Sequence, residues 1–182
     1  MHFHQTNLKD ARLIELEPHG DERGFFARTM CCAEFERHGL LSDFVQQNTS
    51  FSAQRGTLRG LHYQRQPHAE AKLVRCIRGA IVDVIVDIRE ESETYLQHQL
   101  FELTAANRHQ LYVPPGFAHS FQTLTDDVEV SYLVSVAYHP ESERGLRYND
   151  ERLAIEWPIP PTVVSEKDAS WPLISERNEA LF

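Results

Sequence analysis

The chain has 182 residues, of which 41% are hydrophobic and 25% are charged, the composition of a soluble globular domain without a membrane span. Lysine and arginine number 18 against 27 acidic residues, so the formal net charge is −9, which disfavours nucleic acid or an anionic membrane as a partner. An anionic ligand must therefore be bound by local basic residues.

The cysteines and the N-terminal residues indicate the cellular compartment in which the protein resides. Cys31, Cys32 and Cys76 are odd in number and lack zinc-type spacing, so we interpret them as reduced thiols. Residues 1–4 do not open a secretion signal. The sequence therefore predicts a cytoplasmic protein.

The first third of the chain is predicted to hold short strands, turns and one helix. Strands are expected at 13–16 and 25–27 around a turn at 19–24. A helix is predicted over 33–38 because Gly39 follows it as a terminator. A further strand is predicted at 44–48.

From Leu58 to Tyr138 short strands and turns follow one another repeatedly. Residues 72–77, the turn at Arg78 and Gly79, and residues 80–88 predict a β-hairpin. Further strands are expected at 97–103, 110–113, 117–124 and 128–138. This series predicts an all-β protein with a single domain over 1–182, an antiparallel sandwich or jelly-roll barrel. The proline-containing tail, about 158–182, is expected to wrap the barrel irregularly.

Residues 56–64, followed by Lys72, bring basic groups onto two predicted strands. Arg59 and His62 are three residues apart, so a regular strand would point them to opposite faces. Gly60 lies between them and can host a β-bulge that turns both side chains the same way. One cavity is then predicted to hold a titratable base and fixed positive charge. By itself, Lys72 is equally explained as an edge lysine that blocks aggregation.

His62 can act as a base near neutral pH because its unperturbed pKa is about 6.5. A catalytic imidazole needs a partner that fixes its tautomer, usually a carboxylate. Asp83, on an inward-facing strand, and Asp168, in the tail, are both candidates, and spacing does not choose between them. Tyr132 is either a buried aromatic residue with a satisfied hydroxyl or a participant in chemistry.

Residues 114–119, Pro-Pro-Gly-Phe-Ala-His, resemble the second sequence motif of the cupin barrels. The first cupin motif normally contains two histidines flanking one residue, and here that place is occupied by His62, Tyr63 and Gln64. A transition metal requires three or four donors, and only His62 and His119 are evident, so no metal is expected. His119 remains either a structural or a substrate-binding histidine.

Taken together, these segments resemble the dTDP-4-dehydrorhamnose 3,5-epimerase family, whose members are cupin-like jelly rolls. The resemblance extends from about Ile14 to Asp168. It depends on matching segments in family order, at 21–26, 44–48, 58–64, 72–74, 82–89, 114–119, 156–158 and 167–168.

The resemblance implies a role for each catalytic group. His62 would be the general base with Asp168 as its orienting carboxylate, and Tyr132 the acid on the opposite face of the sugar. Lys72 would stabilise the enolate oxygen. The family is homodimeric, which implies that strands within about 12–28 serve the neighbouring subunit. The residues implied to hold the nucleotide, phosphates and sugar are Arg23, Phe26, Gln46, Gln47, Asn48, Arg59, His119, Tyr138, Glu143 and Lys167.

The implied reaction agrees with these residue types. In a nucleotide-diphosphate-linked 4-keto-6-deoxyhexose, C3 and C5 flank the carbonyl, so their protons become acidic only if the enolate is stabilised. A cation beside the oxyanion supplies this, and losing one such donor costs on the order of 3–4 kcal/mol. Epimerisation then needs an acid on the opposite face, and tyrosine, with a pKa near 10, is suitable. No redox cofactor is needed.

The sequence departs from the family pattern at several positions. Arg28 replaces the usual glutamate near the nucleotide base, and an arginine would suit the acceptors of cytosine in a CDP-sugar. Ser120, Leu133 and Ala137 also differ, which leaves epimerisation at C3 or C5 alone, or 3,4-ketoisomerisation, as alternatives. A metal-dependent cupin is disfavoured by Gln64. A non-catalytic sugar-binding barrel is the third possibility.

Overall fold

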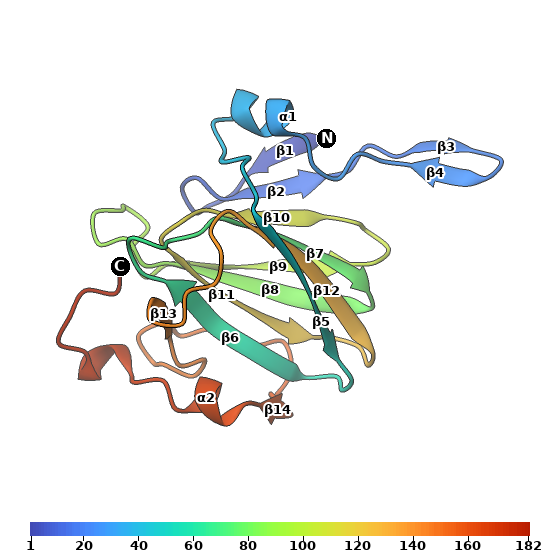
Figure 1. Ribbon diagram of the computed structural model, residues 1–182. Helices are drawn as coiled ribbons and strands as arrows, with labels where there is room; N and C mark the ends of the chain where they lie inside the picture. The colour runs from blue at the N-terminus through green and yellow to red at the C-terminus, as the bar shows by residue number, and fades with distance from the viewer.

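Two antiparallel β-sheets face each other to form the body of the protein, shown in Figure 1 as a computed structural model that describes residues 1–182. The first sheet has the order β1 (His2–Gln5), β2 (Arg12–Glu15), β10 (Gln110–Val113), β7 (Lys72–Arg78), β12 (Val128–Val134), β5 (Gln46–Ser52). The second has the order β13 (Glu143–Gly145), β6 (Thr57–Gln64), β11 (Phe117–Thr123), β8 (Ala80–Asp87), β9 (His98–Thr104), and the two-residue strand β14 (Val163–Val164) pairs with β6 in parallel. The predicted all-β class is confirmed.

The strands alternate between a shared core and two outer faces. Val74 and Cys76 of the first sheet meet Ile81 and Ile85 of the second in the largest buried cluster. Because successive side chains of a strand point to opposite faces, every second residue of these strands must be covered from outside. Apolar burial on both sides of each sheet therefore stabilises the fold.

Two segments cover the outer faces. Helix α1 (Cys32–Arg37) places Phe35 against Leu73 and Tyr112 of the first sheet. The C-terminal tail, with helix α2 (Glu166–Ala169) and the 3-10 helix η1 (Ile174–Glu176), packs Ile174 and Leu181 against the second sheet, on the opposite side of the body in Figure 1. No helix has both the length and the apolar character needed to cross a bilayer.

The predicted hairpin over 72–88 is wrong. β7 pairs with β10 and β12 in the first sheet, whereas β8 pairs with β11 and β9 in the second. At Gly79, whose φ is +78°, the chain crosses from one sheet to the other. The alternation of apolar residues identified both strands correctly, but a local pattern does not specify which strands pair. Here β7 and β8 lie in different sheets, and each packs one face into the core between them.

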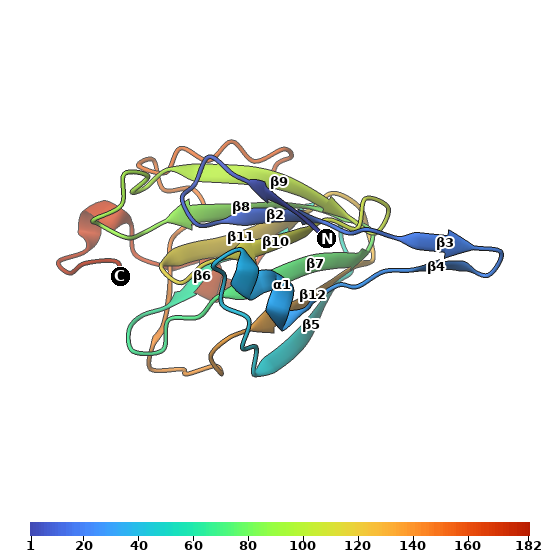
Figure 2. The same ribbon diagram turned by 90° about the horizontal axis from the view of Figure 1, so that it is seen from above.

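Several predicted boundaries also change. The expected turn at 19–24 contains β3 (His19–Asp21), which pairs with β4 (Gly24–Phe26) in a hairpin that projects from the body in Figures 1 and 2. The strand predicted at 44–48 is β5, which runs from Gln46 to Ser52, and the one predicted at 128–138 ends at Val134. The helix prediction is correct to within one residue at each end.

The predicted bulge in β6 is confirmed. His62 lies opposite His119 of β11 and Arg59 lies opposite Phe121, so three steps along β6 match two along β11. Gly60, with φ of +112°, occupies the bulge. As a result, Arg59 and His62 line the same cavity although they are three residues apart.

We predict that Gly60→Ala destabilises the protein by about 2–4 kcal/mol, because a β-carbon there would meet the His119 carbonyl oxygen at 2.5 Å and force an unfavourable φ. Gly39→Ala is the matched control, since Gly39 also has positive φ but open space around it, and should cost about 1 kcal/mol. Urea unfolding measures both. Equal losses would show that the close approach contributes nothing.

Candidate active site

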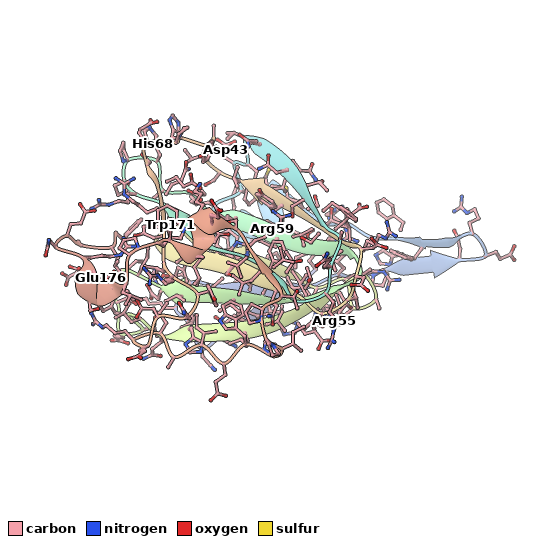
Figure 3. All side chains as sticks on the ribbon, turned by 90° about the horizontal axis from the view of Figure 1, so that it is seen from below. Asp43, Arg55, Arg59, His68, Trp171 and Glu176 are labelled. Carbon is pink, nitrogen blue, oxygen red and sulfur yellow. The ribbon has the colours of Figure 1, made fainter.

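The sheets enclose two adjoining cavities of about 350 and 380 Å³. His62, Lys72 and Tyr132 line both cavities, so they are two lobes of one cleft, which we call the central cleft. His62 comes from β6 of the second sheet, whereas Lys72 and Tyr132 come from β7 and β12 of the first. The two walls of the central cleft therefore carry different chemical groups. Figure 3 views the molecule from the tail side, with Arg59 of β6 and Trp171 labelled.

His62 and Asp168 form a hydrogen-bonded pair on the second-sheet wall. His62 Nε2 lies 2.6 Å from Asp168 Oδ1, and the Gly60 N–H donates to Asp168 Oδ2 at 3.1 Å. The Ser165 hydroxyl accepts from the Asp168 N–H and caps α2. A proton on Nε2 leaves the lone pair on Nδ1, so the pair selects the imidazole tautomer.

Burial by itself would raise the pKa of the Asp168 carboxyl, but hydrogen bonds from His62 and Gly60 outweigh it and hold this pKa below its usual value. Asp168 is therefore ionised at neutral pH. An ionised carboxylate beside His62 stabilises the imidazolium that proton abstraction produces.

Asp83 is not the partner of His62. Its Oδ2 lies 2.9 Å from Nε2 of His119, and both residues are buried. His119 lines the same lobe of the central cleft as Arg59 and Asp168. Sequence spacing did not choose between Asp83 and Asp168, and the structure shows that each carboxylate pairs with a different histidine.

Tyr132 and Lys72 form the first-sheet wall. Burial raises the pKa of the Tyr132 hydroxyl above its ordinary value near 10. The hydroxyl is thus protonated across the physiological range and can donate a proton. Lys72 Nζ lies 3.2 Å from Oε1 of Glu70. Glu70 was not among the site residues predicted from the sequence. Its position two residues before Lys72 could have indicated it, because such residues share one face of an extended chain.

Polar side chains surround the rest of the central cleft. Glu143 accepts from Lys167 at 2.6 Å and from the Tyr138 hydroxyl at 2.7 Å. Burial would raise the pKa of Glu143, but these two hydrogen bonds reverse the shift and lower it. Gln46 donates to Asn48 at 2.9 Å beside them.

Four of the predicted ligand-binding residues lie outside the central cleft. Arg23, Phe26 and Arg28 belong to the projecting hairpin and the segment after it, and Arg28 donates to Glu34 at 2.7 Å beside a separate small cavity. Gln47 donates to Ser131 at 3.1 Å and lines a cavity on the outer side of the first sheet. Gln47 therefore faces the side of the sheet opposite to Gln46, because neighbouring strand residues face opposite ways.

Three side chains apart from the two walls described above are close enough to share an ion. They are His68, His139 and Glu141, whose possible ligand atoms lie within 4.8 Å of one another. The two imidazoles are stacked, with ring centroids 3.6 Å apart and planes at 10°. Nitrogen lone pairs lie in the ring planes, so in stacked rings they run parallel and do not converge on one ion. This arrangement fits ring stacking better than metal coordination.

A histidine on one wall, and a protonated tyrosine and an ammonium group on the other, suit proton transfer at two faces of a sugar carbon. The class of protein is an isomerase that epimerises carbohydrates on a cupin-like barrel. The chain belongs to the dTDP-4-dehydrorhamnose 3,5-epimerase family, whose model matches residues 5–176. Both the predicted family and the predicted isomerase class are confirmed.

Relatives and solved structures agree over nearly the whole chain. The epimerase of Sinorhizobium fredii is 44% identical over 97% of this chain and 91% of its own length, and that of Escherichia coli is 41% identical over 100% and 94%. The crystal structure of the epimerase from Elizabethkingia anophelis has a TM-score of 0.94 at 43% identity, covering 98% of this chain and 99% of that one. The Bacillus anthracis epimerase, solved with TDP and pyrophosphate bound, has a TM-score of 0.92 at 43% identity, covering 95% and 99%.

We predict that Asp168→Asn lowers the free energy of unfolding by about 2 kcal/mol at pH 7, the contribution of hydrogen bonds to a charged group. A depressed folded-state pKa contributes stability above the unfolded pKa, near 3.9, and this is lost as pH falls through the lower folded-state value. The difference between wild type and variant in urea unfolding should therefore shrink below about pH 4.

The control is Glu91→Gln, since Glu91 is exposed and has no hydrogen-bond or ion-pair partner. Its unfolding free energy should follow wild type at every pH. A difference for Asp168→Asn that stays constant from pH 7 to pH 3 would contradict the ionised pair.

Proposed function

We propose that this protein epimerises a dTDP-linked 4-keto-6-deoxyhexose at C3 and C5, with His62 as base and Tyr132 as acid. The observation that carries the proposal is their location on facing walls of the central cleft, from β6 and β12 of opposite sheets. Inversion at carbon needs a proton removed from one face and returned to the other, which two groups on one wall could not achieve.

The forward step uses the lone pair on Nδ1 of His62. It takes the proton from the carbon next to the ketone, and the electron pair of that bond moves into the carbonyl to give an enolate. Asp168 stays ionised and stabilises the imidazolium. Lys72, on the facing wall, supplies the positive charge next to the enolate oxygen, a contribution on the order of 3–4 kcal/mol for a donor of this kind.

The return step uses Tyr132. Its protonated hydroxyl delivers a proton to the enolate carbon from the opposite face, and the carbonyl reforms. The tyrosinate then regains its proton and the imidazolium loses one to water, so no proton is gained or lost overall. The chemistry is complete without a redox cofactor.

The location of basic residues supports a nucleotide diphosphate as the carrier of the sugar. Arg59 and Lys167 line the lobe of the central cleft that also holds His119. One relative, from Legionella pneumophila, was solved in complex with dTDP-4-keto-L-rhamnose and has a TM-score of 0.90 at 40% identity, covering 96% of this chain and 93% of that one. For the base we favour thymine, because Arg28 is already paired with Glu34 and so is not a free donor for cytosine.

A homodimer is part of the proposal. Phe25 and Phe26 of the projecting hairpin are 51% and 72% exposed, and Arg23 lies on the same hairpin. Exposed aromatic residues on an extended hairpin indicate a protein contact surface. We propose that Arg23 and Phe26 complete the central cleft of the partner. Three unpaired cysteines agree with a reducing compartment, and we place the enzyme in the cytoplasm.

Proton NMR in deuterium oxide with dTDP-4-keto-6-deoxyglucose should show loss of both the H3 and H5 signals. His62→Asn should abolish this exchange, whereas Tyr132→Phe should keep exchange at the base-side face but slow formation of the epimer by about 10²–10⁴-fold. This pair of variants separates the base from the acid. The CDP-linked sugar, tested in parallel, should exchange more slowly.

Other outcomes assign the alternatives. Loss of one signal would make the protein a single-carbon epimerase. One relative of known structure, from Streptomyces bikiniensis, is named a 3′-monoepimerase and is 31% identical with a TM-score of 0.87. A 3-keto product would indicate a ketoisomerase. Retention of both signals in a protein that binds dTDP would leave a non-catalytic binding barrel.

The shared site is tested by mixing two inactive variants. His62→Asn has an intact hairpin, and the double variant Arg23→Ala, Phe26→Ala has an intact His62. If the hairpin completes the partner's cleft, each mixed dimer has one complete site, and a random mixture should recover about a quarter of wild-type activity. No recovery after proven subunit exchange would mean that each hairpin serves its own cleft.

A further inference from the structure

Glu70 has a buried carboxylate oxygen without a partner. Its side chain is 6% exposed and lines the central cleft. Oε1 accepts from Lys72 Nζ at 3.2 Å, but Oε2 has no hydrogen-bond partner. Leaving a buried acceptor unpaired costs about 1–3 kcal/mol, and more when it is charged, so native structures rarely retain one without a use.

The main chain on both sides of Glu70 is held in place. The Ala71 N–H donates to the Ser135 hydroxyl at 2.8 Å, and the Ser135 N–H donates to the Ala71 carbonyl at 3.0 Å. On the other side, Gln64 Nε2 donates to the His68 carbonyl at 3.0 Å. Because Ala71 is fully buried, Glu70 and Lys72 on either side of it are directed to the same face, which is the central cleft. The carboxylate is thus positioned before any ligand arrives.

The charge of Glu70 restricts the ligand group that meets it. A phosphate would be repelled, whereas the basic residues Arg59 and Lys167 lie in the other lobe of the central cleft. Glu70 shares its lobe with Tyr132, Gln46 and Asn48. An unpaired anionic oxygen among polar groups suits a neutral hydrogen-bond donor, and the neutral donors of a nucleotide sugar nearest to the reacting carbons are its ring hydroxyls.

We propose that Glu70 is a specificity-determining residue whose Oε2 accepts a hydrogen bond from a ring hydroxyl, at C2 or C3, of the bound hexose. This inference depends on the proposed function. Glu70 selects sugars that carry the hydroxyl, because a deoxy analogue leaves the buried oxygen unpaired. It also holds Lys72 in place through Oε1, so one residue links recognition of the sugar to the oxyanion donor.

The test is titration calorimetry with dTDP, dTDP-glucose and the 2-deoxy and 3-deoxy analogues of dTDP-glucose, none of which has a ketone to react. Glu70→Ala should bind dTDP within twofold of wild type, which also shows that it is folded. Its affinity for dTDP-glucose should fall at least tenfold. With one of the two deoxy analogues, wild type and Glu70→Ala should bind equally.

Glu70→Gln separates recognition of the hydroxyl from positioning of Lys72. The amide keeps a carbonyl acceptor for the hydroxyl but loses the ion pair with Lys72. Glu70→Gln should therefore bind dTDP-glucose nearly as tightly as wild type does. It should also still bind dTDP-glucose more tightly than the deoxy analogue for which wild type and Glu70→Ala have equal affinity. If Glu70 acts only through Lys72, both variants lose the same affinity for every sugar.

The result that overturns the inference is a Glu70→Ala variant that binds dTDP-glucose as wild type does, or one whose loss is the same for all three sugars. Either result leaves the proposed function standing if wild type binds dTDP and exchanges the H3 and H5 protons. A wild-type protein that binds neither dTDP nor dTDP-glucose would reject the proposed function and this inference together.

Discussion

One buried carboxylate, that of Asp168, joins the parts of the molecule on which the central cleft depends. It accepts from His62 and from the Gly60 N–H in the bulge of β6, while its own N–H is capped by Ser165 at the start of α2. A charge taken out of water is tolerated only when such hydrogen bonds replace its hydration. The tail, the bulge and the histidine are therefore mutually dependent, although 106 residues separate His62 from Asp168.

The crossing of the chain between the sheets has a functional consequence. The chain passes from β6 of the second sheet into β7 of the first, and from β11 of the second into β12 of the first. His62 therefore stands on one wall, and Lys72 and Tyr132 stand on the other. The shared apolar core holds the two walls at a constant separation. The packed barrel thus holds His62 and Tyr132 on opposite walls, the arrangement that the proposed inversion requires.

The charges of the protein operate locally rather than through the overall field. A net charge of −9 repels anions at long range, but Arg59, Lys72 and Lys167 gather in the central cleft, where screening by water is reduced. Each carboxylate oxygen that lines the cleft accepts from Lys167, Tyr138, His62, Gly60 or Lys72, except for Oε2 of Glu70. Under the proposed function, electrostatic matching at a few positions separates the phosphate end of the ligand from its sugar end.

The sequence by itself determined the all-β class, most of the strands and the bulge at Gly60, because alternation and glycine conformation are local properties. Residue types also indicated a base and a cation, whereas the acid, Tyr132, was implied by the family resemblance. Only the tertiary structure decided that Asp168 rather than Asp83 holds His62, that β7 and β8 do not pair, and that Gln47 faces away from the cleft. These outcomes depend on contacts between residues far apart in the chain, which the folded core selects and no local pattern encodes.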